Sequence, residues 1–169
     1  KTANQNIHIK TKMIVNATGP WVDQINKLLK ISPPYKLSLV QGSHIVVPKI
    51  YDGDFAYILQ HEDDRIIFAI PYHEKFTLIG TTEHLLDDVP QKIKMTDLEK
   101  QYLLEISNQY FNKSINENNI KYSYCRLRPL ITDENISAAK NISRDYKIHL
   151  EQQGANYVCI FGGKLTTYR

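Results

Sequence analysis

The sequence predicts an α+β fold whose sheet is mostly antiparallel. Residues 55–82 hold three short apolar runs separated by turn residues, a pattern typical of a meander of hairpins. Residues 97–111 and 20–30 carry apolar side chains at helical spacing, which predicts two helices. Apolar runs at 7–17 and 157–161 predict strands that enter a core at each end of the chain.

The composition is that of an ordinary globular protein, with 42% hydrophobic and 23% charged residues among 169. A formal net charge of only +3, with 18 acidic residues interspersed, argues against a nucleic-acid partner. The cysteines, Cys125 and Cys159, form no CxxC motif, so we expect reduced thiols in a cytosolic setting. No apolar run approaches the roughly 20 residues needed to span a bilayer. The first residue is not methionine, and we expect the chain to be a fragment of a longer protein.

The first predicted strand leads through Thr18-Gly19-Pro20 into a short amphipathic helix that ends near Lys30. Its expected apolar face contains Trp21, Val22, Ile25, Leu28 and Leu29. Nucleotide-binding sheets use this order of strand, glycine and helix at their phosphate crossings, although one glycine is a weak signal.

Residues 36–48 predict a long strand with a glycine near its middle, Gly42, where we expect a bulge or the close approach of a ligand. Ser43 and His44 are polar residues within this otherwise apolar strand. The sequence leaves two interpretations of His44 open: a catalytic base, or a hydrogen-bonded histidine that serves packing.

The helix expected from residue 97 to residue 111 begins with a capping box, because Thr96 is followed three residues later by Glu99. We expect Leu98, Tyr102, Ile106 and Tyr110 to form its packing face, and the pattern indicates no chemistry there.

Residues 120–130 predict a strand on which Tyr122, Tyr124, Arg126 and Arg128 share one face. Two arginines and two tyrosines form either a solvated surface or the wall of an anion pocket, since the arginine fork matches phosphate and carboxylate.

The last nine residues, 161–169, begin with the paired glycines Gly162 and Gly163, followed by Lys164, Thr166 and Thr167. Glycines let backbone N–H groups approach a ligand, and a lysine beside a helix start suits a phosphate or another anion. The alternative is a strand, a glycine turn and an ordinary helix start.

Together these stretches resemble one family, the FAD-dependent glycerol-3-phosphate dehydrogenases. The matching motifs occur in family order and cover nearly the whole chain: Val15–Asp23, Gly42–Pro48, Tyr57–Gln60, Phe68–Pro71, Ile79–Glu83, Arg128–Leu130, Ser143–Tyr146 and Phe161–Arg169.

The resemblance implies a mostly antiparallel cap region that holds substrate, flanked by returning pieces of an α/β FAD-binding domain. Residues 1–35 and 157–169 would be the returning pieces, and 36–156 the cap. The family's amino-terminal GxGxxG unit does not occur in this sequence. We therefore expect the chain alone to bind FAD weakly or not at all, and to be inactive.

The resemblance also implies the chemistry: oxidation of glycerol 3-phosphate to dihydroxyacetone phosphate, with hydride transfer to FAD. The resemblance implies Arg128 and Lys164 as catalytic residues. His44 is the third expected catalytic residue, a candidate base by its chemistry, although active-site residues of the family also lie in its amino-terminal part. Arg128, Arg144, Lys164 and Thr167 are expected to bind substrate; Gly19, Gly162, Gly163, Lys164 and Thr166 are expected to bind FAD; and no metal is expected.

Two positions depart from the family pattern. Arg126 stands where a glycine is usual, so we expect an altered pocket rim or a shifted strand, with a second cation beside Arg128. Gln41 stands where lysine is common, and we interpret it as a rim change of little consequence.

The family works at the inner face of the cell membrane as a peripheral protein of the cytoplasmic side and passes electrons to quinone, which we expect here too. A homodimer is left open. The alternatives are a glycerol-3-phosphate oxidase that uses oxygen, an amine or amino-acid oxidase of the same superfamily, and a non-catalytic anion-binding remnant.

Overall fold

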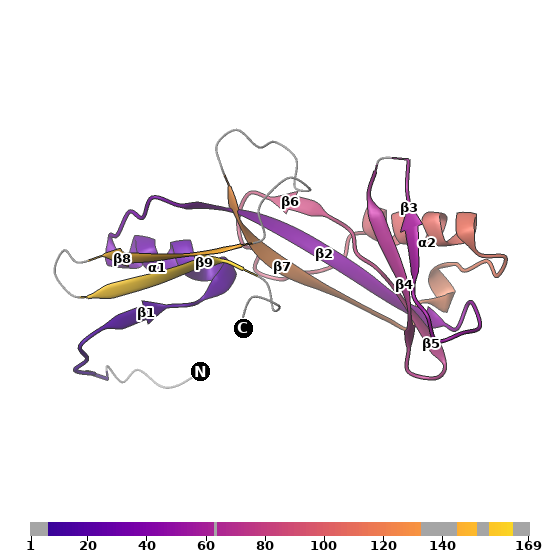
Figure 1. The fold of residues 1–169 in the computed structure, drawn as a ribbon, viewed down its shortest axis with the longest axis horizontal. Helices are drawn as coiled ribbons and strands as arrows, with labels where there is room; N and C mark the ends of the chain where they lie inside the picture. Colours follow the sequence, from indigo (N-terminus) through magenta and orange to yellow (C-terminus); the bar gives the residue numbers. More distant parts are fainter. Residues whose placement is uncertain (1–6, 63, 133–144, 152–155, 164–169) are drawn as a thin grey trace. The chain divides into compact units, whose positions relative to one another are not determined.

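The computed structural model describes residues 7–62, 64–132, 145–151 and 156–163, which fall into two compact units. The first unit contains described residues 7–37, 129–132, 145–151 and 156–163, and the second contains described residues 38–62 and 64–128. The predicted α+β class with mostly antiparallel strands is confirmed (Figure 1). The division into cofactor-binding and cap segments stays a prediction.

The first unit is built on a three-stranded sheet in the order β1-β9-β8. Strand β1 (Ile14–Asn16) runs parallel to β9 (Tyr157–Gly162), which pairs antiparallel with β8 (Tyr146–Glu151). The strand expected over residues 7–17 is confirmed only at 14–16, and Ile7 and Ile9 are exposed.

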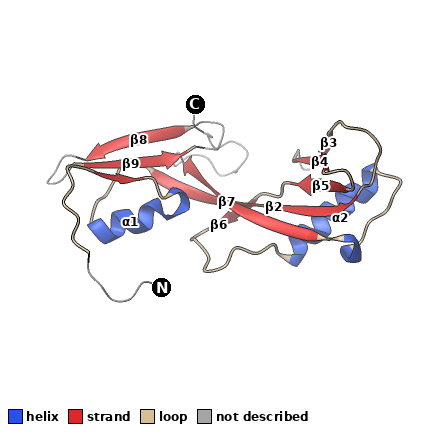
Figure 2. Ribbon diagram, turned by 90° about the horizontal axis from the view of Figure 1, so that it is seen from below, coloured by secondary structure: helices blue, strands red, loops and turns tan. Residues whose placement is uncertain are grey.

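Helix α1 (Val22–Leu29) follows a 3-10 turn, η1 (Gly19–Trp21), and lies beside the three-stranded sheet (Figure 2). Val22 joins the core formed by Tyr157, Cys159 and Phe161, as expected of the apolar face. The expected face is wrong at Trp21, Leu28 and Leu29, which are exposed, while Ile25 is partly buried and the polar Asn26 is fully buried. Hydrogen bonds from Asn16 and Tyr157 to the Asn26 side chain hold it in the buried position, which spacing alone does not reveal.

The second unit contains a six-stranded sheet in the order β3-β4-β5-β2-β6, with β7 also paired to β2. The hairpins are confirmed as β3 (Tyr57–Gln60), β4 (Ile66–Tyr72) and β5 (Phe76–Gly80), and β2 (Lys36–Pro48) and β7 (Tyr122–Thr132) are the two long predicted strands. A strand that we did not predict, β6 (His84–Leu86), pairs with residues 39–41 of β2.

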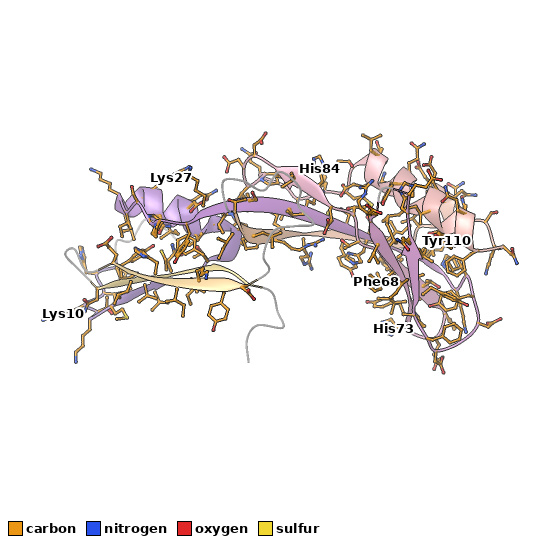
Figure 3. The ribbon with its side chains drawn as sticks, turned by 45° about the horizontal axis from the view of Figure 1, so that its top comes forward. Lys10, Lys27, Phe68, His73, His84 and Tyr110 are labelled. Carbon is orange, nitrogen blue, oxygen red and sulfur yellow. The ribbon has the colours of Figure 1, made fainter. Side chains whose placement is uncertain are left out.

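Helix α2 (Asp97–Tyr110) packs on one face of this sheet, where its Leu103 and Ile106 join Ile45, Ile67 and Ile79 in the core. The capping box is confirmed. The predicted packing face is partly wrong, because Leu98 is 80% exposed and Tyr110 is half exposed. Tyr110, at the end of α2, instead donates a hydrogen bond to the carbonyl of Gln60 (Figure 3). A further 3-10 turn, η2 (Glu117–Asn119), precedes β7.

Candidate functional site in the six-stranded sheet

Strand β2 separates a polar site from the helical side of the sheet, because its side chains alternate between two faces. Ser43 and Ile45 point toward α2, where Ser43 contacts Glu99 and Ile45 enters the core. The His44 side chain, and the position that a Cβ of Gly42 would take, lie on the opposite face. The predicted polar interruption of the strand is therefore two separate features, one on each face.

His44 is held against the sheet by two neighbours. Its ring stacks on Tyr124 of β7, with centroids 5.0 Å apart and planes 9° from parallel. It also covers Gly80 of β5, where an added Cβ would lie only 2.4 Å from His44 Cδ2. The buried Nδ1 atom of His44 has no hydrogen-bond partner among the described residues. Burial first, and then the nearby charge of Arg128, lowers the pKa of His44 below 6.5, so the imidazole is neutral and able to accept a proton near pH 7.

Arg128 lies on the same face, held by the segment that follows β5. Its Nη1 forms an ion pair with Glu83 Oε1 at 3.2 Å, and Nη2 donates to Thr81 Oγ1 at 3.2 Å and to the Thr82 carbonyl at 3.3 Å. The guanidinium lies so close to Gly42 that a Cβ there would be 2.3 Å from Nη2. The close approach predicted at Gly42 is made by the Arg128 side chain.

The structure brings His44 of β2 together with Tyr124 and Arg128, two of the residues predicted to share one face of β7. Arg126 also lies on this strand, with its guanidinium carbon 5.6 Å from the centre of the Tyr124 ring and its Nη1 donating to the Cys125 carbonyl. Strand β7 continues through Arg126, which has no positive φ, so this position does not need the conformation that favours glycine; the expected strand shift stays a prediction. The cation therefore lies over Tyr124, and its expected part in an anion pocket beside Arg128 stays a prediction.

Glu99 was expected only as part of the capping box, yet the residue is buried, with 7% exposure, and its carboxylate bonds to the sheet. Ser43 Oγ and Thr82 Oγ1 donate to its Oε1 at 2.7 and 2.6 Å, and Gln41 Nε2 donates to its Oε2 at 3.0 Å. The interpretation of Gln41 as a rim residue is therefore wrong, since it is buried against Glu99. One signal for this buried cluster was available in the sequence: the polar Gln41 and Ser43 alternate with Ile45 on the same face of β2.

Burial by itself raises the pKa of the Glu99 carboxyl. Hydrogen bonds from Thr82, the Thr96 amide, Ser43 and the Thr96 hydroxyl outweigh burial and lower that pKa below its ordinary value. Glu99 is therefore an anion at neutral pH.

The glycines expected to approach FAD belong to the other unit. Gly19 and Gly162 have φ of +59° and +67°, a conformation that favours glycine, and a Cβ at Gly19 would meet nothing within 4 Å. An open backbone at Gly19 fits the close approach of a cofactor. The expectation of a free N–H is wrong for Gly163, whose amide donates to the Asp145 carbonyl at 3.0 Å.

A buried hydrogen-bond network supports the turn that contains Gly19. Asn16 Nδ2 donates to the Val22 carbonyl and to Tyr157 Oη, and Thr18 Oγ1 donates to Asn16 Oδ1 at 2.7 Å. Tyr157 Oη in turn donates to Asn26 Oδ1 at 2.6 Å. The turn after β1 is thus fixed from both sides.

Arg144, Lys164, Thr166 and Thr167 lie outside the described residues, so their predicted roles stay predictions. Within the described ranges, no group of three or more His, Cys, Asp or Glu side chains is placed to hold a metal ion. No helix in the described part of the chain is long and apolar enough to cross a membrane.

Comparison with known proteins identifies the family. Residues 1–169 match the family described as FAD dependent oxidoreductase. The chain belongs to this family. Of the glycines expected to border FAD, Gly19 has open space beside it, whereas a Cβ at Gly162 would lie 2.6 Å from the Asp145 carbonyl oxygen, so the cofactor role of Gly162 stays a prediction.

Individual relatives agree with the motif resemblance to glycerol-3-phosphate dehydrogenases. A glycerol-3-phosphate dehydrogenase of Pseudomonas aeruginosa is 44% identical over 164 residues, which is 95% of this chain and 32% of that protein. The aerobic glycerol-3-phosphate dehydrogenase of Escherichia coli is 44% identical over 159 residues, covering 92% of this chain and 32% of that protein. A D-erythritol 1-phosphate dehydrogenase of Brucella abortus is 35% identical over 162 residues, with 95% and 32% covered.

A solved structure supports the same assignment. The glycerol-3-phosphate dehydrogenase of Bacillus halodurans, complexed with FAD, matches with a TM-score of 0.79 and 32% identity over 95% of this chain and 30% of that chain. The resemblance that the motifs indicated is confirmed. The chain spans about a third of the length of these relatives.

Proposed function

We propose that this chain is the part of a flavoprotein dehydrogenase that carries the base and a substrate-binding cation for oxidation of sn-glycerol 3-phosphate to dihydroxyacetone phosphate. The observation that carries this proposal is the pairing of a neutral His44 with a fixed Arg128 on one sheet face, in a chain 44% identical to glycerol-3-phosphate dehydrogenases.

Each residue has a defined task in this reaction. Arg128 binds the substrate phosphate through its guanidinium, whose fork is already oriented by Glu83, Thr81 and Thr82. His44 accepts the proton of the C2 hydroxyl, for which its lowered pKa keeps it neutral. Bound FAD supplies the chemistry of hydride acceptance from C2. Lys164, Arg144 and Thr167 are proposed to complete the substrate cleft, and Gly19, Gly162, Gly163 and Thr166 to border the FAD.

We further propose that the electrons pass to quinone and that the enzyme works at the inner face of the cell membrane, with homodimerisation left open. The relatives described as aerobic dehydrogenases support this placement. Quinone reduction measured beside oxygen consumption tests it, because oxygen uptake without quinone reduction would identify an oxidase.

The experiment is anaerobic mixing of the full-length flavoprotein that contains this chain with glycerol 3-phosphate, followed through the visible absorbance of the oxidised flavin. Bleaching is expected in the wild-type protein, and Arg128→Ala is expected to require a much higher substrate concentration.

Lys113→Ala is the control, because it removes a cation whose Nζ donates to the Lys49 carbonyl at 2.6 Å, a group outside the proposed site. D-erythritol 1-phosphate is tested as the alternative substrate, since one relative is named D-erythritol 1-phosphate dehydrogenase. No bleaching by either compound in a flavin-loaded protein would refute the proposed function, and bleaching by D-erythritol 1-phosphate alone would reassign the substrate.

A further inference from the structure

The two carboxylate oxygens of Glu99 have different partners. Oε2 accepts from the Thr96 amide at 2.8 Å and from Gln41 Nε2 at 3.0 Å, so it serves the cap of α2. Oε1 accepts from Ser43 Oγ and Thr82 Oγ1 at 2.7 and 2.6 Å. Capping of the helix therefore accounts for one oxygen, and the other is bonded to the sheet.

Burying the Glu99 carboxylate carries a large desolvation penalty. Among the described residues no lysine or arginine forms an ion pair with it, and the lysine next to it, Lys100, pairs with Asp97 at 2.6 Å. A buried anion without a cation is stable only where hydrogen bonds replace the water that it loses. An apolar residue at this position would pack α2 against the sheet without that desolvation cost. The carboxylate instead holds the groups that donate to it, the Ser43 and Thr82 hydroxyls, in fixed positions.

Thr82 connects this carboxylate to the proposed substrate site. Its hydroxyl donates to Glu99 and accepts from the Ser43 amide at 3.0 Å. Its carbonyl accepts from Arg128 Nη2 at 3.3 Å. Its two neighbours, Thr81 and Glu83, provide the other side-chain partners of that guanidinium. The residue at the centre of the Arg128 clamp is therefore anchored from the opposite face of the sheet.

We propose that Glu99 is a positioning residue for Arg128 and that it acts through Thr82. The carboxylate fixes the Thr82 side chain, which sets the carbonyl and the neighbouring Thr81 and Glu83 side chains around the guanidinium. This inference rests on the proposed function, in which Arg128 binds the phosphate of the substrate.

The test compares Thr82→Val, which keeps the side-chain shape but removes the hydroxyl, with Thr82→Ser, which retains it. In the full-length flavoprotein we expect Thr82→Val to raise the KM for glycerol 3-phosphate about tenfold with a smaller fall in kcat, because a displaced cation weakens phosphate binding. Thr82→Ser is expected to restore the wild-type KM.

Glu99→Gln provides a second variant should Thr82→Val fail to fold. The amide directs an N–H₂ group toward the donors on Gln41 or Thr82, so we expect the same rise in KM. Leu103→Ala is the matched control, because it weakens the packing of α2 without removing a hydrogen bond of Glu99. We expect it to lower the melting temperature and leave KM unchanged. A KM that is unchanged in both Thr82→Val and Glu99→Gln would overturn the proposal, as would an equal rise in Leu103→Ala.

Failure of the proposed function is distinguishable from failure of this inference. If the wild-type flavoprotein does not oxidise glycerol 3-phosphate, the side-chain NMR signals of Arg128 and a crystal structure of Thr82→Val decide the question. A guanidinium that leaves Thr81 and Glu83 in the variant supports the positioning role, and one that keeps both contacts overturns it.

Discussion

Gly42→Ala is expected to disable the site chiefly by displacing the Arg128 guanidinium. The added Cβ would lie 2.3 Å from Arg128 Nη2 and 2.6 Å from Thr81 Oγ1, whereas ordinary contact begins at 3.4 Å. The guanidinium must therefore retreat by about 1.1 Å, the difference between 3.4 and 2.3 Å. Its hydrogen bonds to Thr81 and the Thr82 carbonyl are already 3.2 and 3.3 Å long, so a retreat that lengthens either by a few tenths of an ångström is expected to break it.

A misplacement of this size is expected to lower kcat/KM for glycerol 3-phosphate by roughly 100-fold, by the cost of about 1 Å in a positioned group. The assay is anaerobic flavin reduction in the full-length flavoprotein. Adding Gly42→Ala to Arg128→Ala provides the control, because a protein without the guanidinium has lost the main clash and the second change is expected to add little. The reasoning is refuted if Gly42→Ala alone keeps wild-type kcat/KM, or if its effect is as large without Arg128 as with it.

Three further results are expected. Burial and the Arg128 charge lower the pKa of His44 below 6.5, so the acid limb of kcat/KM is expected below pH 6.5. Arg128→Gln removes the charge and is expected to move this limb to higher pH in a pH–rate profile. An unmoved limb would exclude the charge effect. Burial, and then contact with Cys159, raises the pKa of Tyr157 to about 12 from 10.0. The folded state thus holds this proton more tightly, so its contribution to stability is complete below pH 10 and is lost between pH 10 and 12. Melting temperatures across that range should show a fall that is smaller in Tyr157→Phe, and equal falls would contradict the assignment. Leu103→Ala should destabilise the second unit by about 2–5 kcal/mol, whereas Leu98→Ala, at a side chain 80% exposed, should change stability by less than about 0.5 kcal/mol in denaturant titrations.

The sequence by itself determined the fold class, the main strands and the family. Alternation and turn residues mark β3, β4 and β5, and a capping box marks the start of α2, because these signals depend only on residues close together in the chain. The two-residue period of β7 also placed Tyr124 and Arg128 on one face correctly. Family motifs distributed over nearly the whole chain added the expected chemistry.

Only the tertiary structure decided how those residues are used. Glu99 reads as a helix cap in the sequence, and its second oxygen found partners in Ser43 and Thr82, which lie 56 and 17 residues away. The partner of Gly42 was Arg128, on a strand paired with β2 but distant in the chain. On α1 the buried side chain is that of Asn26, and not those of the expected leucines, because Asn16 and Tyr157 donate hydrogen bonds to it. Buried polar groups are satisfied by partners distant in sequence, and local periodicity carries no information about them.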